Sequence, residues 1–178
     1  WKGQYEFVQA LKLLKDKGIV DNSWQVLEKD FTGTLPDAPC FVPLDYWLAN
    51  KDKLQNPKTV GVWLDSEQEP EEIAGDIKNL EHLAVNFPTF TDGRGFSIAR
   101  LIRHRYQFAG ELRAIGQIAP DQLFYLTRCG FDAFCLDALA LDQEIDEAHR
   151  FEDYLSSFSV TYQASANEQQ PLFRRRQA

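Results

Sequence analysis

The chain has 178 residues and a net charge of −8, with 44% hydrophobic and 26% charged residues. This composition is typical of one globular domain that is large enough to bury a core. No apolar run approaches the ~20 residues of a membrane-spanning helix, and the first residues lack the apolar stretch of a secretion signal, so we expect a cytoplasmic protein. The negative charge argues against nucleic acid as a partner, because such binding depends on Lys and Arg.

Cysteine and glycine spacings point to no cofactor. Cys40, Cys129 and Cys135 form no C-x-x-C pair and have no histidine at metal-ligand spacing. This predicts reduced thiols and no zinc, iron–sulfur or haem site. The Gly93-Arg94-Gly95 turn lacks the third glycine of a dinucleotide-binding loop, and the chain has no P-loop. We therefore expect neither a metal nor an organic cofactor.

The first part of the chain reads as a lead-in to the rest of the domain. Apolar residues recur at helical spacing over residues 5–17, and Gly18 follows as a helix stop, which predicts an amphipathic helix. Residues 24–28 are expected to form a short strand. Residues 31–39 are rich in Gly, Thr and Pro and are expected to be a loop. Residues 1–39 are thus predicted to be an N-terminal helix and loop.

From Cys40 onward, short apolar strands alternate with helices. The predicted strands are residues 40–44, 60–65, 83–87, 111–116 and 132–137. The predicted helices are residues 45–54 (capped by Asp45), 70–80, one from Ser97, 120–130 and 142–155. The alternation predicts an α/β fold of βα units with mainly parallel strands and right-handed crossovers.

The arrangement of these units is either an open doubly wound sheet or a partial barrel. The strands are nearly continuous apolar runs, as in a sheet that helices cover on both faces. Four or five units are too few to close an eight-stranded barrel. We expect one domain over residues 1–158, followed by a polar C-terminal tail over residues 159–178. The oligomeric state stays open.

The turn at residues 91–97, T-D-G-R-G-F-S, joins a predicted strand to a predicted helix. Glycines let a backbone approach a ligand closely, and the free amides of a helix start attract anions. Arg94 precedes the predicted helix start at Ser97, and Arg100 is at about its third position, so both cations stand at the positive end of the helix dipole. The pattern predicts a bound oxyanion. The alternative is that Asp92 pairs with these arginines and fixes the turn.

Two glycines in one turn also suggest a backbone conformation that other residues disfavour. We expect Gly93 or Gly95 to have a positive φ.

Other polar residues are expected to join this turn, because parallel strands bring their carboxyl ends to one edge of the sheet. The residues expected at that edge are Asp65, Asn86, Asp92, Arg94, Gln117 and Asp137. The candidate ligand-binding residues are Asp92, Gly93, Arg94, Gly95, Ser97, Arg100, Arg113 and Gln117. The candidates for acid–base catalysis are Asp92 and Asp65, although an Asp at a strand end also serves as a helix N-cap.

The arginines are unevenly distributed along the chain. All nine Lys lie at or before Lys78, and all ten Arg lie at or after Arg94. Between residues 91 and 128 there are six Arg and only three acids. The pattern predicts a locally basic surface suited to oxyanions, since Arg binds them in a bidentate fashion. A solvated basic face without a ligand is the alternative.

Two blocks of the sequence resemble a bacterial family of unknown function, domain of unknown function 934. The string Asn86-Phe87-Pro88 through Thr91-Asp92-Gly93-Arg94-Gly95-Phe96-Ser97 to Leu101 resembles its FP-x-F-x-DGRG-[FY]-S-x-ARLLR block. Residues 110–116 and 128–134 are similar to its second block, and residues 162–163 and 171–173 to its ending. Gln117 stands where the family commonly has Asp, and Pro120 where it often has Arg.

The resemblance implies a partner rather than a reaction. Members of this family are typically encoded beside sulfite reductase and other sulfate-assimilation enzymes, and no catalytic residues carry over. One hypothesis is an accessory protein of assimilatory sulfate or sulfite reduction that binds a small oxyanion or one of these enzymes. The other is a small α/β enzyme acting on an anionic metabolite, with Asp92 or Asp65 as acid–base and Arg94 and Arg100 as anchors. The missing catalytic fingerprints favour the first.

Overall fold

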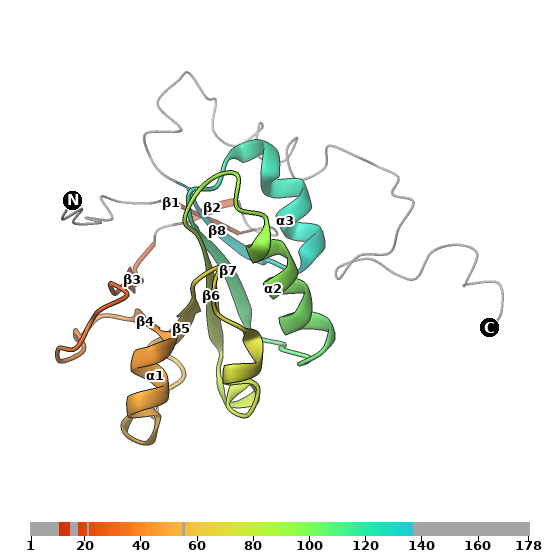
Figure 1. Cartoon of the computed structure of the whole chain (residues 1–178). Helices are drawn as coiled ribbons and strands as arrows, with labels where there is room; N and C mark the ends of the chain where they lie inside the picture. Colours follow the sequence, from red (N-terminus) through yellow and green to blue (C-terminus); the bar gives the residue numbers. More distant parts are fainter. Residues whose placement is uncertain (1–10, 15–17, 21, 55, 137–178) are drawn as a thin grey trace.

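The computed structural model describes residues 11–14, 18–20, 22–54 and 56–136 (Figure 1). Its strands are β1 (Leu11–Leu14), β2 (Gly18–Val20), β3 (Gln25–Val26), β4 (Cys40–Pro43), β5 (Val60–Leu64), β6 (His82–Phe87), β7 (Glu111–Gly116) and β8 (Ala133–Leu136). The α-helices are α1 (Leu44–Asn50), α2 (Arg94–His104) and α3 (Leu123–Cys129). The 3-10 helices are η1 (Lys51–Lys53), η2 (Pro70–Ile73), η3 (Ile77–Asn79) and η4 (Pro120–Gln122). The predicted helix at 142–155, the predicted tail and Asp137 lie outside the described residues.

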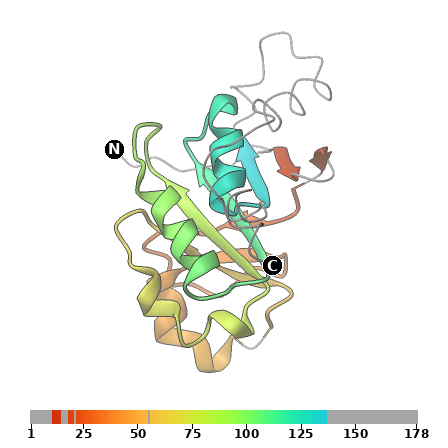
Figure 2. The same ribbon diagram turned by 90° about the vertical axis from the view of Figure 1, so that its right-hand side faces the viewer.

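The sheet is a half-barrel. Strands β3 to β8 are all parallel, and neighbours along the chain are neighbours in the sheet. Right-handed crossovers that always step in the same direction place their helices on one face, and Figure 2 shows α2 and α3 together in front of the sheet. A doubly wound sheet would need a reversal of strand order, and these six strands have none. The partial-barrel alternative is therefore confirmed.

Both faces of the half-barrel sheet are buried, and each belongs to a different hydrophobic cluster. Alternate strand residues such as Val62, Leu83 and Val85 pack with α1, α2 and α3 in the larger core. The intervening residues form a second cluster on the concave face: Phe41, Trp63, Ala84, Ile115 and Cys135, with Trp24 and Val26 packed against them. The strands therefore read as continuous apolar runs, and among the described residues it is Trp24 and Val26, of the segment around β3, that pack against the second cluster.

The prediction of an N-terminal helix is wrong for the part of it that the structure describes. Residues Leu11–Leu14 form β1, which pairs antiparallel with both β2 and β8. Gly18 begins β2 and does not end a helix. Without β1, strand β8 would expose its unpaired backbone groups at the edge of the half-barrel. The tertiary demand for those hydrogen bonds overrides the local helical spacing.

Three predicted helices have different boundaries. Helix α1 begins at Leu44 with the extended Pro43 as its N-cap, so Asp45 lies in the first turn and is not the cap. The predicted helix 70–80 is two 3-10 segments, η2 and η3, on either side of Gly75. Helix α2 begins at Arg94, three residues before the expected start. By contrast, β7 has its predicted limits, and Gly130 ends α3 in the left-handed conformation. None of the helices in the described part combines the length and apolarity needed to cross a bilayer.

Candidate functional site at the carboxyl edge

Asp65 follows β5 directly and gathers three donors at the carboxyl edge of the half-barrel. Its Oδ2 accepts a hydrogen bond from Lys29 Nζ at 2.6 Å. Its Oδ1 accepts from the Ser66 amide at 2.9 Å and from Asn86 Nδ2 at 3.3 Å. Asn86 comes from β6, so the predicted meeting of Asp65 and Asn86 at this edge is confirmed. Lys29 was not predicted, although its position just beyond the strand expected at 24–28 was a usable signal.

These contacts keep Asp65 ionised. Partial burial alone disfavours the charged carboxylate, but the hydrogen bonds from Lys29, Ser66 and Asn86 outweigh it and lower the pKa of Asp65 below its ordinary value. The bond to Asp65 in turn raises the pKa of Lys29. Lys29 is therefore a protonated cation at neutral pH and not a free amine nucleophile.

Asp92 and Arg94 form a closed pair at the start of α2. The Arg94 guanidinium donates from Nε to Asp92 Oδ1 at 3.0 Å and from Nη2 to Oδ2 at 2.7 Å. The Arg94 backbone amide also donates to Asp92 Oδ1 at 3.1 Å. Hydrogen bonding by Arg94 holds the pKa of Asp92 well below its usual range. Asp92 thus supplies the negative charge that the helix N-terminus attracts.

The two arginines of the turn are not placed as predicted. Arg94 is the first residue of α2, and its side chain is 54% exposed, with Nη1 at 3.8 Å from Glu67 Oε1. Arg100 lies in the middle of α2 and is exposed, so it does not stand in the first turn. The prediction placed both relative to a helix start at Ser97, and the earlier start shifts them inward. The alternative, in which Asp92 pairs with the arginines of the turn, is confirmed for Arg94.

The expected positive φ at Gly93 or Gly95 is wrong. Gly93 is the N-cap with φ −82°, and Gly95 lies in the first turn of α2. Gly95 is instead needed for packing, because a Cβ there would lie 2.5 Å from the Phe87 ring. The described glycines with positive φ are Gly116, at 91°, and Gly130, at 106°. Gly116 ends β7, and a Cβ there would lie 2.4 Å from the Phe87 carbonyl oxygen.

Of the remaining predicted residues, Gln117 follows β7 at the carboxyl edge, as predicted, whereas Ser97 is on α2 and Arg113 is inside the half-barrel. The Gln117 amide donates to the Phe87 carbonyl at 2.7 Å, which ties the ends of β6 and β7 together, and its side chain is exposed. Ser97 is exposed on α2. Arg113 is fully buried in the middle of β7 on the concave face.

Arg113 is held by contacts in the interior. Its Nη2 donates to Glu111 at 2.7 Å and its Nη1 donates to Asn22 at 3.1 Å, and its guanidinium lies 4.8 Å from the centre of the Phe41 ring. These partners belong to the start of β7 and to the segment before β3. Arg113 is therefore an interior residue and is not brought to the Asp92–Arg94 turn.

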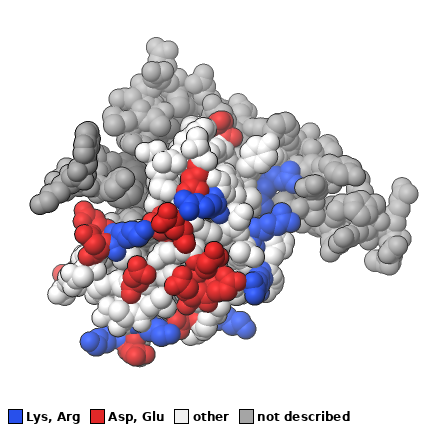
Figure 3. Space-filling view, viewed as in Figure 1, with Lys and Arg blue, Asp and Glu red and all other residues white. Residues whose placement is uncertain are grey.

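The predicted basic surface is largely neutralised. Arg103 pairs with Asp132 and Arg105 with Glu71, in addition to the Arg94 and Arg113 pairs described above. Asp132 and Glu71 lie outside the window of residues 91–128, so a count within the window missed them. Figure 3 shows acidic side chains gathered over the segment between β5 and β6, which includes Glu71.

Two large hydrophobic side chains are exposed in the described part of the chain. Phe90 is 49% exposed on the loop between β6 and α2, and Tyr125 is 56% exposed on α3. Gln122 of η4 donates a hydrogen bond from Nε2 to the Phe90 carbonyl at 3.2 Å, which holds this loop against the start of α3. The exposure of both residues was not predicted, since an aromatic side chain in an apolar pattern is indistinguishable from a core residue.

Comparisons with known proteins give a family and no activity. Within the described residues, no group of three or more His, Cys, Asp or Glu side chains is placed to hold a metal ion. A comparison with curated proteins gives no match. Residues 61–173, more than half of the chain, match the family described as "Bacterial protein of unknown function (DUF934)". This match begins at the second residue of β5 and includes β6 to β8, the Asp92–Arg94 turn and the Phe90 loop. The chain therefore belongs to this bacterial family of unknown function.

Proposed function

We propose that the protein is a non-catalytic accessory protein of assimilatory sulfate and sulfite reduction. Its carboxyl edge would bind a partner enzyme such as sulfite reductase, and the Asp92–Arg94 turn would receive a small oxyanion. The sulfur link rests on the family resemblance. The observation that carries the choice of binding over catalysis is the state of the two candidate acids, Asp65 and Asp92.

Neither acid is tuned for proton transfer near neutral pH. An efficient general acid or base has a pKa near the working pH. Hydrogen bonds lower the pKa of both Asp65 and Asp92, so each stays an ionised carboxylate with little tendency to take up a proton. Lys29 and Arg94 occupy the oxygens that would otherwise contact a substrate. The Lys29–Asp65 and Asp92–Arg94 pairs thus support a preformed polar surface for binding and not a catalytic site.

An exposed aromatic residue on the loop that leads into the Asp92–Arg94 turn supports a protein partner. Phe90 is 49% exposed, and the side chain of Arg94, four residues further along the chain, is half exposed. Aromatic residues and Arg are enriched among the residues that dominate binding energy at interfaces. The bond from Gln122 to the Phe90 carbonyl holds the loop in place, which lowers the entropy cost of docking.

An oxyanion at this turn would compete with Asp92 for Arg94. The Arg94 Nη1 and the positive end of the α2 dipole are the groups that favour an anion. Asp92 and Glu67 oppose it. We expect Asp92→Asn to raise the affinity for sulfate or sulfite by about tenfold, and Arg94→Ala to abolish binding. Calorimetric titration measures both. Unchanged affinity in both variants would exclude the turn as the oxyanion site.

The partner is tested by co-purification from the native host at low salt. We expect a sulfate-assimilation enzyme to be retained, and to be lost as the ionic strength rises, because exposed charge pairs are screened over ~8–10 Å. Phe90→Ser and Arg94→Ala should each weaken retention about tenfold. Arg105→Ala is the matched control, because Arg105 is an exposed, ion-paired arginine at the far end of α2.

The enzyme alternative rests on the Lys29–Asp65–Asn86 group at the edge where α/β enzymes hold their reactive residues. It predicts turnover of a small anion by the isolated protein, and loss of that turnover in Asp65→Asn. If the isolated protein shows such turnover and no assimilation enzyme is retained in the co-purification, the protein is an enzyme and not an accessory protein.

A further inference from the structure

Two exposed aromatic side chains, Phe90 and Tyr125, come to one place at the carboxyl edge. The loop that carries Phe90 and the start of α3 follow the neighbouring strands β6 and β7, so both lie at this edge (Figure 1). Gln122 joins them, because its Nε2 donates to the Phe90 carbonyl at 3.2 Å. Tyr125 is three residues further along, on the same side of the helical segment. The two rings thus offer an apolar surface that is held in position.

The groups around this aromatic pair carry an excess of negative charge. Asp121 is exposed on η4, and Asp92 is two residues beyond Phe90. Glu67 lies 3.8 Å from Arg94, the cation of this group, which is paired with Asp92. Three acids and one cation leave a net negative charge. The surface therefore favours a segment that joins apolar side chains to basic ones.

The nearest further cations do not change this balance at the acidic end. Lys29 is paired with Asp65. Burial raises the pKa of Cys129, and the positive charge of Arg100 opposes this shift. Because Cys129 is one helical turn beyond Tyr125, Arg100 makes that side of the pair unfavourable for basic residues. A basic segment is therefore directed towards the acids and away from α2.

Residues 171–176, which lie outside the described residues, have this composition. Their sequence is P-L-F-R-R-R, and residues 163–170 before them contain no large apolar side chain. Pro171 has a fixed φ, and proline-containing segments dock on exposed aromatic side chains at a low entropy cost. The match to the family ends at residue 173, so it includes the apolar part of this segment.

The chain leaves the described part on the side of the aromatic pair. Strand β8 is parallel to β7, so its end at Leu136 is at the carboxyl edge. Helix η4 follows the end of β7 at the same edge. At about 3.3 Å per residue, residues 137–170 can span the distance across a domain of this size. The connection therefore allows residues 171–176 to reach the aromatic pair of the same chain.

We propose that residues 171–176 dock on the carboxyl edge of their own chain. Leu172 and Phe173 cover the exposed rings of Phe90 and Tyr125, and the three arginines that follow lie towards the acids beside them. The contact removes apolar side chains of both segments from water. It occupies the surface to which a partner enzyme would bind, and only this consequence rests on the proposed function.

A photo-crosslink from residue 173 tests the contact in the full chain. Phe173→p-benzoylphenylalanine keeps a large aromatic side chain and bonds to nearby C–H groups on irradiation. We expect a crosslink within one chain that peptide mass spectrometry maps to residues 88–92 or 119–125. Tyr162→p-benzoylphenylalanine is the matched control from the same polar stretch, and should give these crosslinks about tenfold less often.

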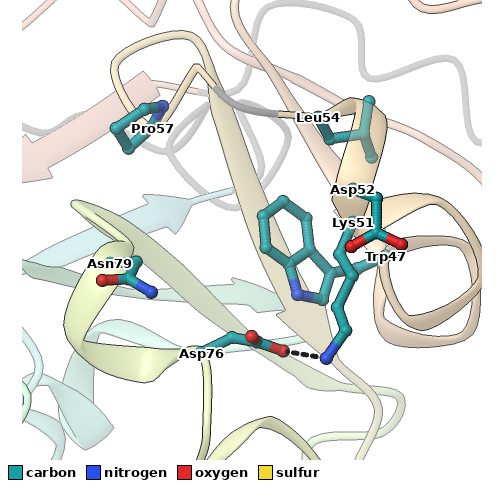
Figure 4. A pocket seen from close by; sticks show the side chains of 7 residues that line it. All are labelled: Trp47, Lys51, Asp52, Leu54, Pro57, Asp76 and Asn79. Atoms are coloured by element: carbon teal, nitrogen blue, oxygen red, sulfur yellow. Dashed lines mark hydrogen bonds and ion pairs between the residues drawn. The ribbon is translucent and has the colours of Figure 1, made fainter.

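A pocket elsewhere on the molecule offers the same side chains a different place. It has a volume of about 540 Å³, lies between the end of α1 and η3, and includes Leu54 and Pro57 in its walls (Figure 4). Its lining residues Lys51 and Asp76 form an ion pair. A crosslink from residue 173 to residues 47–57, a crosslink only between two chains, or no crosslink to the carboxyl edge would overturn the proposal.

Variants of the aromatic pair test which surface is used. Phe90→Ser and Tyr125→Ser change exposed residues, so both proteins should fold, and each should lower the crosslink yield about fivefold. Ser97→Ala changes an exposed residue of α2 outside the pair and should alter the yield less than about twofold. Equal yields in the three variants would exclude the aromatic pair as the docking surface.

Replacement of the arginines tests the basic end of the segment. Arg174→Gln, Arg175→Gln and Arg176→Gln together should lower the yield about threefold at low salt and remove its dependence on salt. A yield that keeps its salt dependence in this variant would overturn the pairing of the arginines with the acids. These yields involve no partner enzyme, so their failure and a failed co-purification are separate results.

Discussion

Gly95 illustrates a residue whose identity follows from packing. A Cβ at this position would lie 2.5 Å from the Phe87 ring, while one at Gly93 would meet nothing within 4 Å. We expect Gly95→Ala to lower the free energy of unfolding by about 1–3 kcal/mol, the range for overpacking a filled core. Gly93→Ala should change it by less than about 0.5 kcal/mol. Urea denaturation compares the two variants, and equal losses would contradict the packing argument.

The lowered pKa of Asp92 predicts how the stability of the fold changes at acid pH. Its pKa is lowered from 3.8 by Arg94, so the unfolded chain takes up a proton at higher pH than the folded protein does. The stabilisation is therefore complete above the ordinary pKa and is lost as the pH falls below about 4. We expect Asp92→Asn to make the free energy of unfolding less dependent on pH between about 5 and 2. Asp65 shares the direction of shift, so part of the slope remains.

Urea denaturation at a series of pH values measures this slope. Asp121→Asn is the control, because Asp121 is an exposed acid of η4 outside the ion pairs described above. It should keep the slope of the unaltered protein. A slope that is equally steep in Asp92→Asn would show that this carboxylate does not stabilise the fold.

Arg103 connects several elements of the half-barrel. From α2, its Nε donates to the Gly130 carbonyl at 2.8 Å, and its Nη1 donates to the carbonyls of Phe108 at 2.6 Å and Gly110 at 2.9 Å. Its Nη2 donates to Asp132, which also accepts from the Leu112 amide of β7. One guanidinium thus joins α2 to the end of α3 and to the loops at the amino ends of β7 and β8.

Replacement of Arg103 by lysine keeps the charge and loses the fork of donors. We expect Arg103→Lys to lower the free energy of unfolding by about 3 kcal/mol, because buried carbonyls and Asp132 lose their partners. Arg105→Lys removes the same group from an exposed pair with Glu71 and should cost less than about 1 kcal/mol. Thermal and urea unfolding measure both, and similar losses would mean that Arg103 acts only as a surface charge.

The N-terminal strands complete the sheet of the whole molecule. Leu13 of β1 lies opposite Phe134 of β8 and Ile19 of β2, so backbone groups of β1 pair on both sides. We expect Leu13→Pro to lower the free energy of unfolding by about 1–3 kcal/mol more than Leu13→Ala, which keeps the backbone N–H. Exposure of the β8 edge should also increase association of the Pro variant, which light scattering detects. Equal stability of the two variants would place residue 13 outside the sheet.

The limits of some strands and helices of the half-barrel can be predicted from the sequence, because residues close together in the chain determine them. Strand β7 has its predicted limits at Glu111 and Gly116. Pro120 begins η4 and Gly130 ends α3, as the sequence predicted. The α/β class follows from alternating units. The meeting of Asp65 and Asn86 follows because parallel strands bring their carboxyl ends to one edge.

Long-range contacts determined the rest. Spacing alone leaves a doubly wound sheet and a half-barrel equally acceptable, since the order of strands depends on which faces pack together. Segment 11–14 has a helical pattern and becomes a strand because β8 needs a partner for its backbone hydrogen bonds. Glu71 and Asp132 neutralise arginines more than 25 residues away in the chain. A sequence lists charges and apolar side chains, but only the tertiary structure decides which are paired, buried or left exposed for a partner.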